Sequence, residues 1–200
     1  MNVAYFSETH APAGPVAIEQ AAATFGWHLG RPFLHCHAIW IEPDGTRRGG
    51  HILNDESISR GGIAVEAWGF ETLRIETWED TETNFTLFQP SRAAPDDGHA
   101  VLARIKPNED ILSAIEATAR AHGIRNATIA GSLGSLVGTH FEDGRVVPGD
   151  ATEVLVRSGS VRNGMAALDV ASVDMAGHVH EGRLKSGENP VCITFDLVLL

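Results

Sequence analysis

The stretch that decides the fold runs from Phe33 to Leu53 and has the sequence FLHCHAIWIEPDGTRRGGHIL. Residues 33–41 are apolar and rich in β-prone side chains. Residues 42–45 (EPDG) have Pro at the second position and Gly at the fourth, which is typical of a β-turn. The chain then returns through residue 53, so the stretch predicts a β-hairpin.

Three histidines of this hairpin are predicted to lie together. Side chains on a strand alternate between its two faces, so His35 and His37 share one face and lie roughly 7 Å apart along the strand. A turn centred near Asp44 places residue 37 roughly opposite His51. The two glycines at 49–50 fit a bulge or a close approach of another backbone.

Three neutral imidazoles suit zinc or a similar divalent ion. Three protein ligands leave a fourth position for water or substrate, which distinguishes a reactive metal site from a closed structural one. The alternative is that His35, His37 and His51 are ordinary polar residues on a solvated face, because the chain has ten histidines and His-x-His alone is a weak signal. The third histidine at the mirrored position favours the metal.

The composition is that of an ordinary globular protein. A hydrophobic content of 43% allows a buried core, and 200 residues allow one large domain or two small ones. The net charge of −11, without a long basic run, argues against direct DNA binding. Cys36 and Cys192 lack a metal-type spacing and are expected to be reduced core residues. Because neither a leader nor a membrane-spanning apolar run occurs, a soluble cytoplasmic chain is expected.

The rest of the first half is assigned from composition and alternation. Residues 16–25 are expected to form a short helix, and His28 and Glu66 are expected to be structural and surface residues. A loop-type composition at 90–98 predicts a domain boundary, which separates residues 1–90 from residues 98–200. Strands are expected at 3–6, 63–68, 72–78 and 84–88.

The second half contains the clearest helix of the chain. Asn108 is expected to be its N-cap, with two carboxylates in the first turn, and Gly123 is expected to end it. An apolar stripe along one face predicts packing against a core. The stripe consists of Ile111, Leu112, Ile115 and Ala119, and strands are expected at 100–105, 127–130, 152–157, 165–173 and 190–199.

A Gly-Ser-rich stretch follows the 127–130 strand. Ser132, Gly134 and Ser135 could line a substrate or anion pocket with backbone N–H groups. The stretch lacks the Lys and the spacing of a nucleotide P-loop, so ATP is not expected. Small residues that allow tight strand packing explain the same pattern equally well.

Residues 165–184 resemble a diverged copy of the hairpin. When Gly177 is aligned with Gly45, Ala167, Asp169 and Arg183 stand where the first copy has His35, His37 and His51. An ion pair between Asp169 and Arg183 is expected in place of the metal. His178 and His180 are out of register with the triad and are expected to face solvent.

Two patterns make the chain resemble the plants and prokaryotes conserved domain family, also abbreviated PPC or PCC. One is the His-x-His pattern with an acidic-Pro-Asp-Gly turn and Gly-Gly-His-x-Leu, carried by His35, His37, Pro43, Asp44, Gly45, Gly49, Gly50 and His51. The other is a helix, a strand and a Gly-Ser-Leu-Gly-Ser-Leu stretch between Pro107 and Leu136.

The resemblance implies an α+β fold with a mostly antiparallel, barrel-like β-sheet and a packed helix, similar to that of acetolactate decarboxylase. It implies tandem copies, with the histidine triad in residues 1–90 and a copy without it in residues 98–200. It also implies a homo-oligomer, specifically a trimer, and three histidines that resemble a zinc site. Bacterial members carry a DNA-binding label taken from plant relatives with AT-hooks, but no Arg-Gly-Arg-Pro pattern occurs here.

The sequence supports three functional hypotheses. The first is a metal-dependent enzyme with zinc at His35, His37 and His51, acting on a small polar substrate that could be anionic and that Ser132 or Ser135 would orient. The likeness to acetolactate decarboxylase makes lyase chemistry conceivable, but no general acid is identifiable. The second is a non-catalytic regulatory module that associates with DNA through a partner. The third is a closed structural metal site with four protein ligands.

Overall fold

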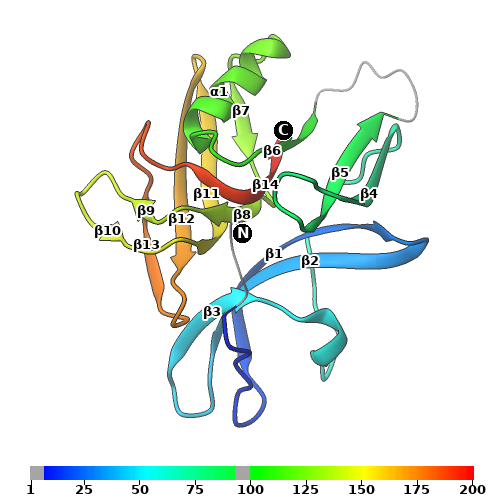
Figure 1. The fold of residues 1–200 in the computed structure, drawn as a ribbon, viewed down its shortest axis with the longest axis vertical. Helices are drawn as coiled ribbons and strands as arrows, with labels where there is room; N and C mark the ends of the chain where they lie inside the picture. The colour runs from blue at the N-terminus through cyan, green and yellow to red at the C-terminus, as the bar shows by residue number, and fades with distance from the viewer. Residues whose placement is uncertain (1–6, 93–99) are drawn as a thin grey trace.

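The structure is a computed structural model, and it describes residues 7–92 and 100–200. The fold is α+β, with curled, mostly antiparallel sheets and a single α-helix among the described residues (Figure 1). The strands are β1 (Ala17–His28), β2 (Arg31–Ile41), β3 (Arg47–His51), β4 (Leu73–Glu79), β5 (Thr86–Arg92), β6 (Val101–Ile105), β7 (Ala127–Ile129), β8 (Leu133–Leu136), β9 (Thr139–His140), β10 (Val146–Val147), β11 (Thr152–Arg162), β12 (Met165–Val173), β13 (Val179–Arg183) and β14 (Val191–Leu199). The helices are α1 (Ile111–Ala121) and the short 3-10 helix η1 (Asn54–Glu56).

The first half forms a five-stranded sheet in the order β3-β2-β1-β4-β5. β1 and β2 pair antiparallel over their whole length, from Ala17 opposite Ile41 to His28 opposite Arg31. β4 joins β1 in parallel at Trp27 and Glu76. The predicted hairpin therefore forms one side of this sheet.

The second half forms a larger sheet in the order β13-β12-β11-β7-β14-β6, in which β8 also pairs with β11 and β14. In Figure 1, α1 lies at the end of this sheet opposite the β1–β2 hairpin. The apolar stripe predicted for α1 is buried in the main core with side chains of β7, β11 and β14. The strands β9 and β10 form a separate two-stranded ladder.

Both ends of α1 follow from local chemistry. The N-cap is Asp110, whose side chain accepts a hydrogen bond from the Ser113 N–H at 2.9 Å. The prediction of Asn108 as the N-cap is wrong, because Asn108 has a φ of +67° two residues earlier and both carboxylates precede the first turn. Gly123 ends the helix as predicted, with a φ of +69°.

Two predictions in the first half are wrong. Residues 17–25 of the segment expected to be a helix are part of β1, because pairing with β2 outweighs the helix propensity of an Ala-rich segment. Residues 63–68 form no strand; they are exposed, and no neighbouring strand pairs with them. Glu66 is exposed as expected. The strand expected at 3–6 lies outside the described residues.

The other predicted strands are present with shifted bounds. β4 confirms the strand expected at 72–78, and β5 begins two residues later than expected and continues to Arg92. The second part of the predicted boundary at 90–98 lies outside the described residues. His28 contacts the Thr77 hydroxyl at 2.7 Å, as a structural residue would.

The hairpin register is the one predicted from the turn. His37 pairs with His51 and Ile41 with Arg47, and the N–H of Gly45 donates to the Glu42 carbonyl at 2.9 Å across the turn. The β12–β13 hairpin repeats this register over five pairs, from Asp169 with Arg183 to Val173 with Val179. No described helix has the length and apolar character needed to cross a membrane.

The hairpin of the first half packs directly on the second half. Ile39 is fully buried in a cluster with Leu155 and Ala171. The Gly49 N–H donates to the Gly177 carbonyl at 3.2 Å, and a Cβ at Gly49 would lie 2.7 Å from a methyl group of Val173. This close approach is the reason for glycine at position 49. On the same hairpin, His37 contacts Val154 of β11 and His35 contacts Asp196 of β14.

Candidate metal centre

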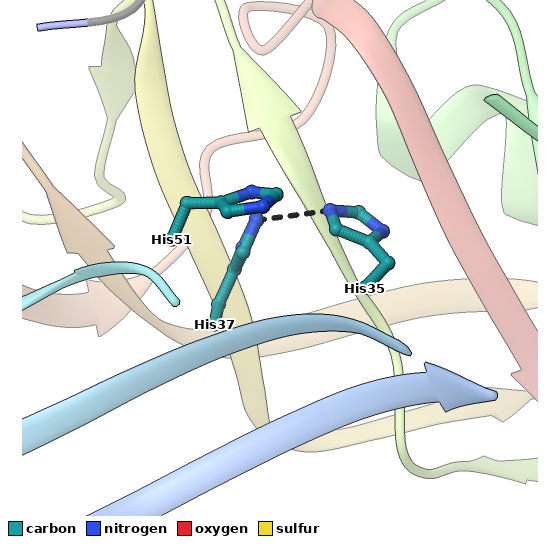
Figure 2. A group of neighbouring side chains, drawn as sticks. All are labelled: His35, His37 and His51. Atoms are coloured by element: carbon teal, nitrogen blue, oxygen red, sulfur yellow. Dashed lines mark hydrogen bonds between the residues drawn. The ribbon is translucent and has the colours of Figure 1, made fainter. Parts of the chain in front are cut away.

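Three imidazoles from the hairpin converge on one point. One nitrogen each of His35, His37 and His51 lies within 4.8 Å of the others, and the ring centroids are 4.8–5.4 Å apart. Figure 2 shows the three rings facing one another, with Nε2 of His35 3.1 Å from Nε2 of His37. Neighbouring donor atoms in a tetrahedral zinc site with Zn–N bonds of about 2.05 Å are about 3.3 Å apart. The spacing of 3.1 Å between the His35 and His37 nitrogens is close to that value.

A backbone carbonyl of the second half fixes the orientation of His37. The side chain is only 2% exposed, and its Nδ1 lies 3.0 Å from the Val154 carbonyl oxygen. A carbonyl can only accept, so Nδ1 carries the hydrogen and the neutral ring presents a lone pair at Nε2.

A buried carboxylate fixes the orientation of His35. Nδ1 of His35 lies 3.3 Å from Oδ2 of Asp196, which is 5% exposed and also accepts from the Thr24 hydroxyl at 2.6 Å. Thr24 stands directly opposite His35 on β1. Because an ionised carboxylate only accepts, this contact places the hydrogen of His35 on Nδ1 and the lone pair on Nε2.

Together these contacts create an arrangement that needs a positive charge at its centre. The hydrogen bonds behind His35 and His37 leave two nitrogen lone pairs facing each other at 3.1 Å. Two lone pairs at that distance repel unless a proton or a metal ion lies between them. The donor set of three imidazoles, with nitrogen atoms exposed toward a common point, fits a divalent ion of the zinc type.

A second carboxylate lies on the metal-facing side. Oε2 of Glu153 is 2.9 Å from Nε2 of His37, and its side chain is 38% exposed. Burial opposes ionisation of both groups, but their mutual attraction outweighs it, raising the pKa of His37 and lowering the pKa of Glu153. In the described part of the chain, neither Glu153 nor Asp196 forms an ion pair with Lys or Arg.

The third imidazole stays neutral over a wide pH range. Burial, and then the positive charges that His37 and His35 can carry, lower the pKa of His51 to about 4. A ligand imidazole must be neutral to bind a metal, so His51 is ready to coordinate at neutral pH.

Both cysteines are buried free thiols, as expected. Burial first, and then the nearby carboxylates of Glu153 and Asp150, raise the pKa of Cys192 to about 11. Burial also raises the pKa of Cys36. The two side chains are therefore protonated at neutral pH, which makes them poor metal ligands.

The Gly-Ser stretch lies within the second sheet, on β8 and directly before it. The Ser132 hydroxyl accepts from the Val198 N–H at 3.0 Å, and the Ser135 hydroxyl accepts from the Ile193 N–H at 3.0 Å. A Cβ at Gly134 would lie 2.4 Å from the Thr194 carbonyl oxygen. These contacts are those of the packing alternative, and substrate binding by Ser132, Gly134 and Ser135 stays a prediction.

The second hairpin lacks the corresponding centre. Asp169 and Arg183 pair across the strands in the predicted register, but the predicted ion pair between them is wrong. Asp169 contacts Arg157 at 3.1 Å and Arg183 contacts Glu142 at 3.2 Å, because these partners extend from neighbouring segments toward each side chain.

The groups behind and beside the triad are residues for which the sequence predicted no role at the site. Glu153 and Asp196 lie more than 100 residues beyond His51 along the chain. Thr24 lies nine residues before Phe33, in a segment that was expected to be a helix. Asp196 gave one signal, since it is a charged residue in the middle of an apolar strand, where an unpaired charge is costly to bury. Nothing in the sequence indicated which residue it would contact.

Several solved structures are similar to part of this chain. A hypothetical protein from Salmonella enterica is 25% identical, covers 50% of this chain and 75% of its own, and has a TM-score of 0.44. A plant- and prokaryote-conserved protein from Pyrococcus horikoshii is 22% identical (51% and 78% covered, TM-score 0.40). A metal-containing protein from Archaeoglobus fulgidus is 19% identical (52% and 79% covered, TM-score 0.40). No curated protein shows a significant match.

The family match lies in the second half of the chain. The model of the Plants and Prokaryotes Conserved (PCC) domain matches residues 92–200, which is more than half of the chain. That range contains Glu153, Val154 and Asp196 but not the histidine triad. The chain belongs to the PCC domain family.

Proposed function

We propose that His35, His37 and His51 bind a divalent metal ion, zinc in the first place, and that the chain is a metal-dependent enzyme for a small polar substrate. The observation that carries this proposal is the pair of facing Nε2 atoms of His35 and His37, 3.1 Å apart. Their lone pairs are aimed at each other by acceptors behind both rings. A cation at the common point satisfies that geometry, and in its absence a proton on Nε2 of His37 does. Among the described residues, the two nearby carboxylates have no Lys or Arg partner, and they add to the attraction for a positive charge.

The proposed site is partly open. The three imidazoles provide three ligands and leave a fourth position for water or substrate. A divalent ion there would polarise a carbonyl or lower the pKa of a bound water. The rings are held by a carbonyl and a carboxylate, so little reorganisation is needed when the ion binds. Glu153 reaches the same side of the cluster from a partly exposed position.

Metal analysis of the purified protein tests the proposal. We expect about one zinc or similar ion per chain, and loss of that ion in His51→Ala. His178→Ala is the matched control, because His178 is 69% exposed and contacts Asp174 on the other hairpin. Full metal occupancy in His51→Ala, or equal loss in the control, would contradict the site.

We also propose that residues 1–90 and 98–200 are two diverged copies of an acetolactate-decarboxylase-like domain. The repeated five-pair register of the β2–β3 and β12–β13 hairpins supports this proposal. A homo-oligomer, specifically a trimer, is part of it, and the exposed apolar side chains of Phe25, Trp27 and Leu29 are surfaces that a second copy could cover. Analytical ultracentrifugation tests the assembly state.

The competing function is a regulatory module bound to DNA. The net charge of −11 disfavours direct contact with phosphates. A binding assay titrated with salt distinguishes the two, since tight binding that weakens steeply with salt would favour the DNA-binding function over the enzyme.

A further inference from the structure

The two carboxylates at the centre lie on opposite sides of the ligand rings. Asp196 contacts Nδ1 of His35, the nitrogen that faces away from the proposed metal. Glu153 contacts Nε2 of His37, the nitrogen that faces it. Glu153 is also far more exposed, with 38% of its side chain accessible against 7% for Asp196. Glu153 is therefore the carboxylate on the side from which a fourth ligand would approach the proposed ion.

The charges of the site sum to zero once a divalent ion is present. The ion contributes two positive charges, the imidazoles are neutral as ligands, and Glu153 and Asp196 contribute one negative charge each. Sites that bind anionic substrates usually present Arg or Lys to the anion. In the residues described here, neither carboxylate forms an ion pair with such a side chain, so no Lys or Arg offsets the charge that Glu153 presents to an incoming anion.

We propose, on the basis of the metal site proposed above, that the open position takes an uncharged molecule with a carbonyl, hydroxyl or imine donor, and that Glu153 excludes anions from it. A bound anion would lie within a few ångströms of the Glu153 carboxylate. A neutral donor avoids that repulsion, and its N–H or O–H group can donate a hydrogen bond to Oε2. Glu153 thereby determines the charge class of the substrate.

The experiment uses the full chain loaded with Co²⁺, whose visible absorption changes when a ligand enters its coordination shell. The probes are imidazole, which is neutral at about pH 8, and the anion thiocyanate. We expect imidazole to change the spectrum at a concentration about tenfold lower than thiocyanate does. Tighter binding of thiocyanate than of imidazole to the unaltered protein would overturn the inference.

Substitution of Glu153 isolates its role. Glu153→Gln is expected to tighten thiocyanate binding by about tenfold or more, with imidazole binding changed by less than about threefold. Glu153→Asp keeps the charge and is expected to keep thiocyanate binding weak. Glu181→Gln is the matched control, because Glu181 is a partly exposed glutamate paired with Arg47 and Arg157. Unchanged thiocyanate affinity in Glu153→Gln would overturn the inference.

The same titration separates this inference from the function on which it rests. If the unaltered protein binds no Co²⁺, the metal site is wrong and the inference is overturned with it. If Co²⁺ binds and the anion is preferred, the metal site stands and the inference alone fails.

Discussion

Asp196→Asn is the substitution that most directly tests whether the second half orients the metal ligands. The carboxylate is 5% exposed, and its Oδ2 holds both the His35 ring at 3.3 Å and the Thr24 hydroxyl at 2.6 Å. Asparagine has nearly the same shape, so the cavity stays filled and the Thr24 hydroxyl keeps an acceptor. The substitution removes the negative charge behind His35.

The magnitude follows from the type of contact that is lost. A carboxylate behind a ligand imidazole fixes its tautomer and raises its basicity, and loss of such a partner weakens metal binding by about 10–100-fold. At about 1.4 kcal/mol for each factor of ten, this is about 1.4–2.8 kcal/mol of binding free energy. The 3.3 Å distance is long for a charge-assisted hydrogen bond, so we expect a value toward the lower end of that range.

The assay is a zinc titration against a chromophoric chelator at constant pH, with circular dichroism to confirm that each variant is folded. Asp169→Asn is the matched control, because Asp169 occupies the equivalent hairpin position to His37 in the second half and pairs with Arg157. It should leave zinc affinity unchanged. A folded Asp196→Asn variant with the affinity of the unaltered protein would refute the reasoning.

Three further predictions concern protonation and packing. Zinc affinity should fall as the pH decreases, beginning above pH 6.5, because the pKa of His37 is raised above that value and a proton competes with the metal. Chelator competition at several pH values measures this fall. A zinc affinity that does not change with pH would contradict the prediction. In the metal-free protein, the pKa of His51 is about 4, against 6.5 for a free imidazole, so the unfolded state takes up this proton first as the pH falls. The free energy of unfolding should therefore decrease from pH 6.5 toward pH 4. Denaturant unfolding should show a smaller decrease in His51→Gln, and an equal decrease would argue against the lowered pKa of His51. Ile39→Ala should lower the free energy of unfolding by about 2–5 kcal/mol, because Ile39 is fully buried against Leu155. Ile58→Ala is the control and should change it by less than about 0.5 kcal/mol, because the Ile58 side chain is 93% exposed. Equal effects would contradict the packing of Ile39 against the second half.

The hairpin was predictable from sequence because its determinants are local. A turn sequence fixes the register, and the register fixes which residues stand opposite each other. His37 faces His51 for this reason, and the alternation of side chains adds His35 to the same face. The helix stripe from Ile111 to Ala119 was predictable for the same reason, since its periodicity depends on neighbouring turns only.

The errors arise where a contact with a residue outside the segment decides the outcome. The Ala-rich segment of β1 has a helix-prone composition, but β2 offers it a pairing partner along its whole length. Conversely, residues 63–68 have a strand-like composition and no partner, so they stay irregular. The N-cap was misplaced by two residues because Asn108 and Asp110 are both capping residue types, and the hydrogen bond from Ser113 decides between them.

The groups that orient the triad could not be predicted from the sequence. Val154 lies 117 residues from His37 along the chain, and Asp196 lies 161 residues from His35. No periodicity or spacing rule connects residues at such separations. Only the packing of the hairpin on the second half, which depends on the absence of a side chain at Gly49, brings them together.

The described residues hold two hairpins with the same register but one candidate metal centre, because the donors and the groups behind them come from different halves of the chain. A metal site needs neutral donors on one hairpin and acceptors behind them on another element. At the β12–β13 hairpin, Asp169 is paired with Arg157, so a charged pair stands where the β2–β3 hairpin has a neutral donor. At the β2–β3 hairpin, the second half supplies the acceptors and the first half supplies the imidazoles. Each half therefore provides the component that the other lacks, and binding of the proposed ion would stabilise the contact between them.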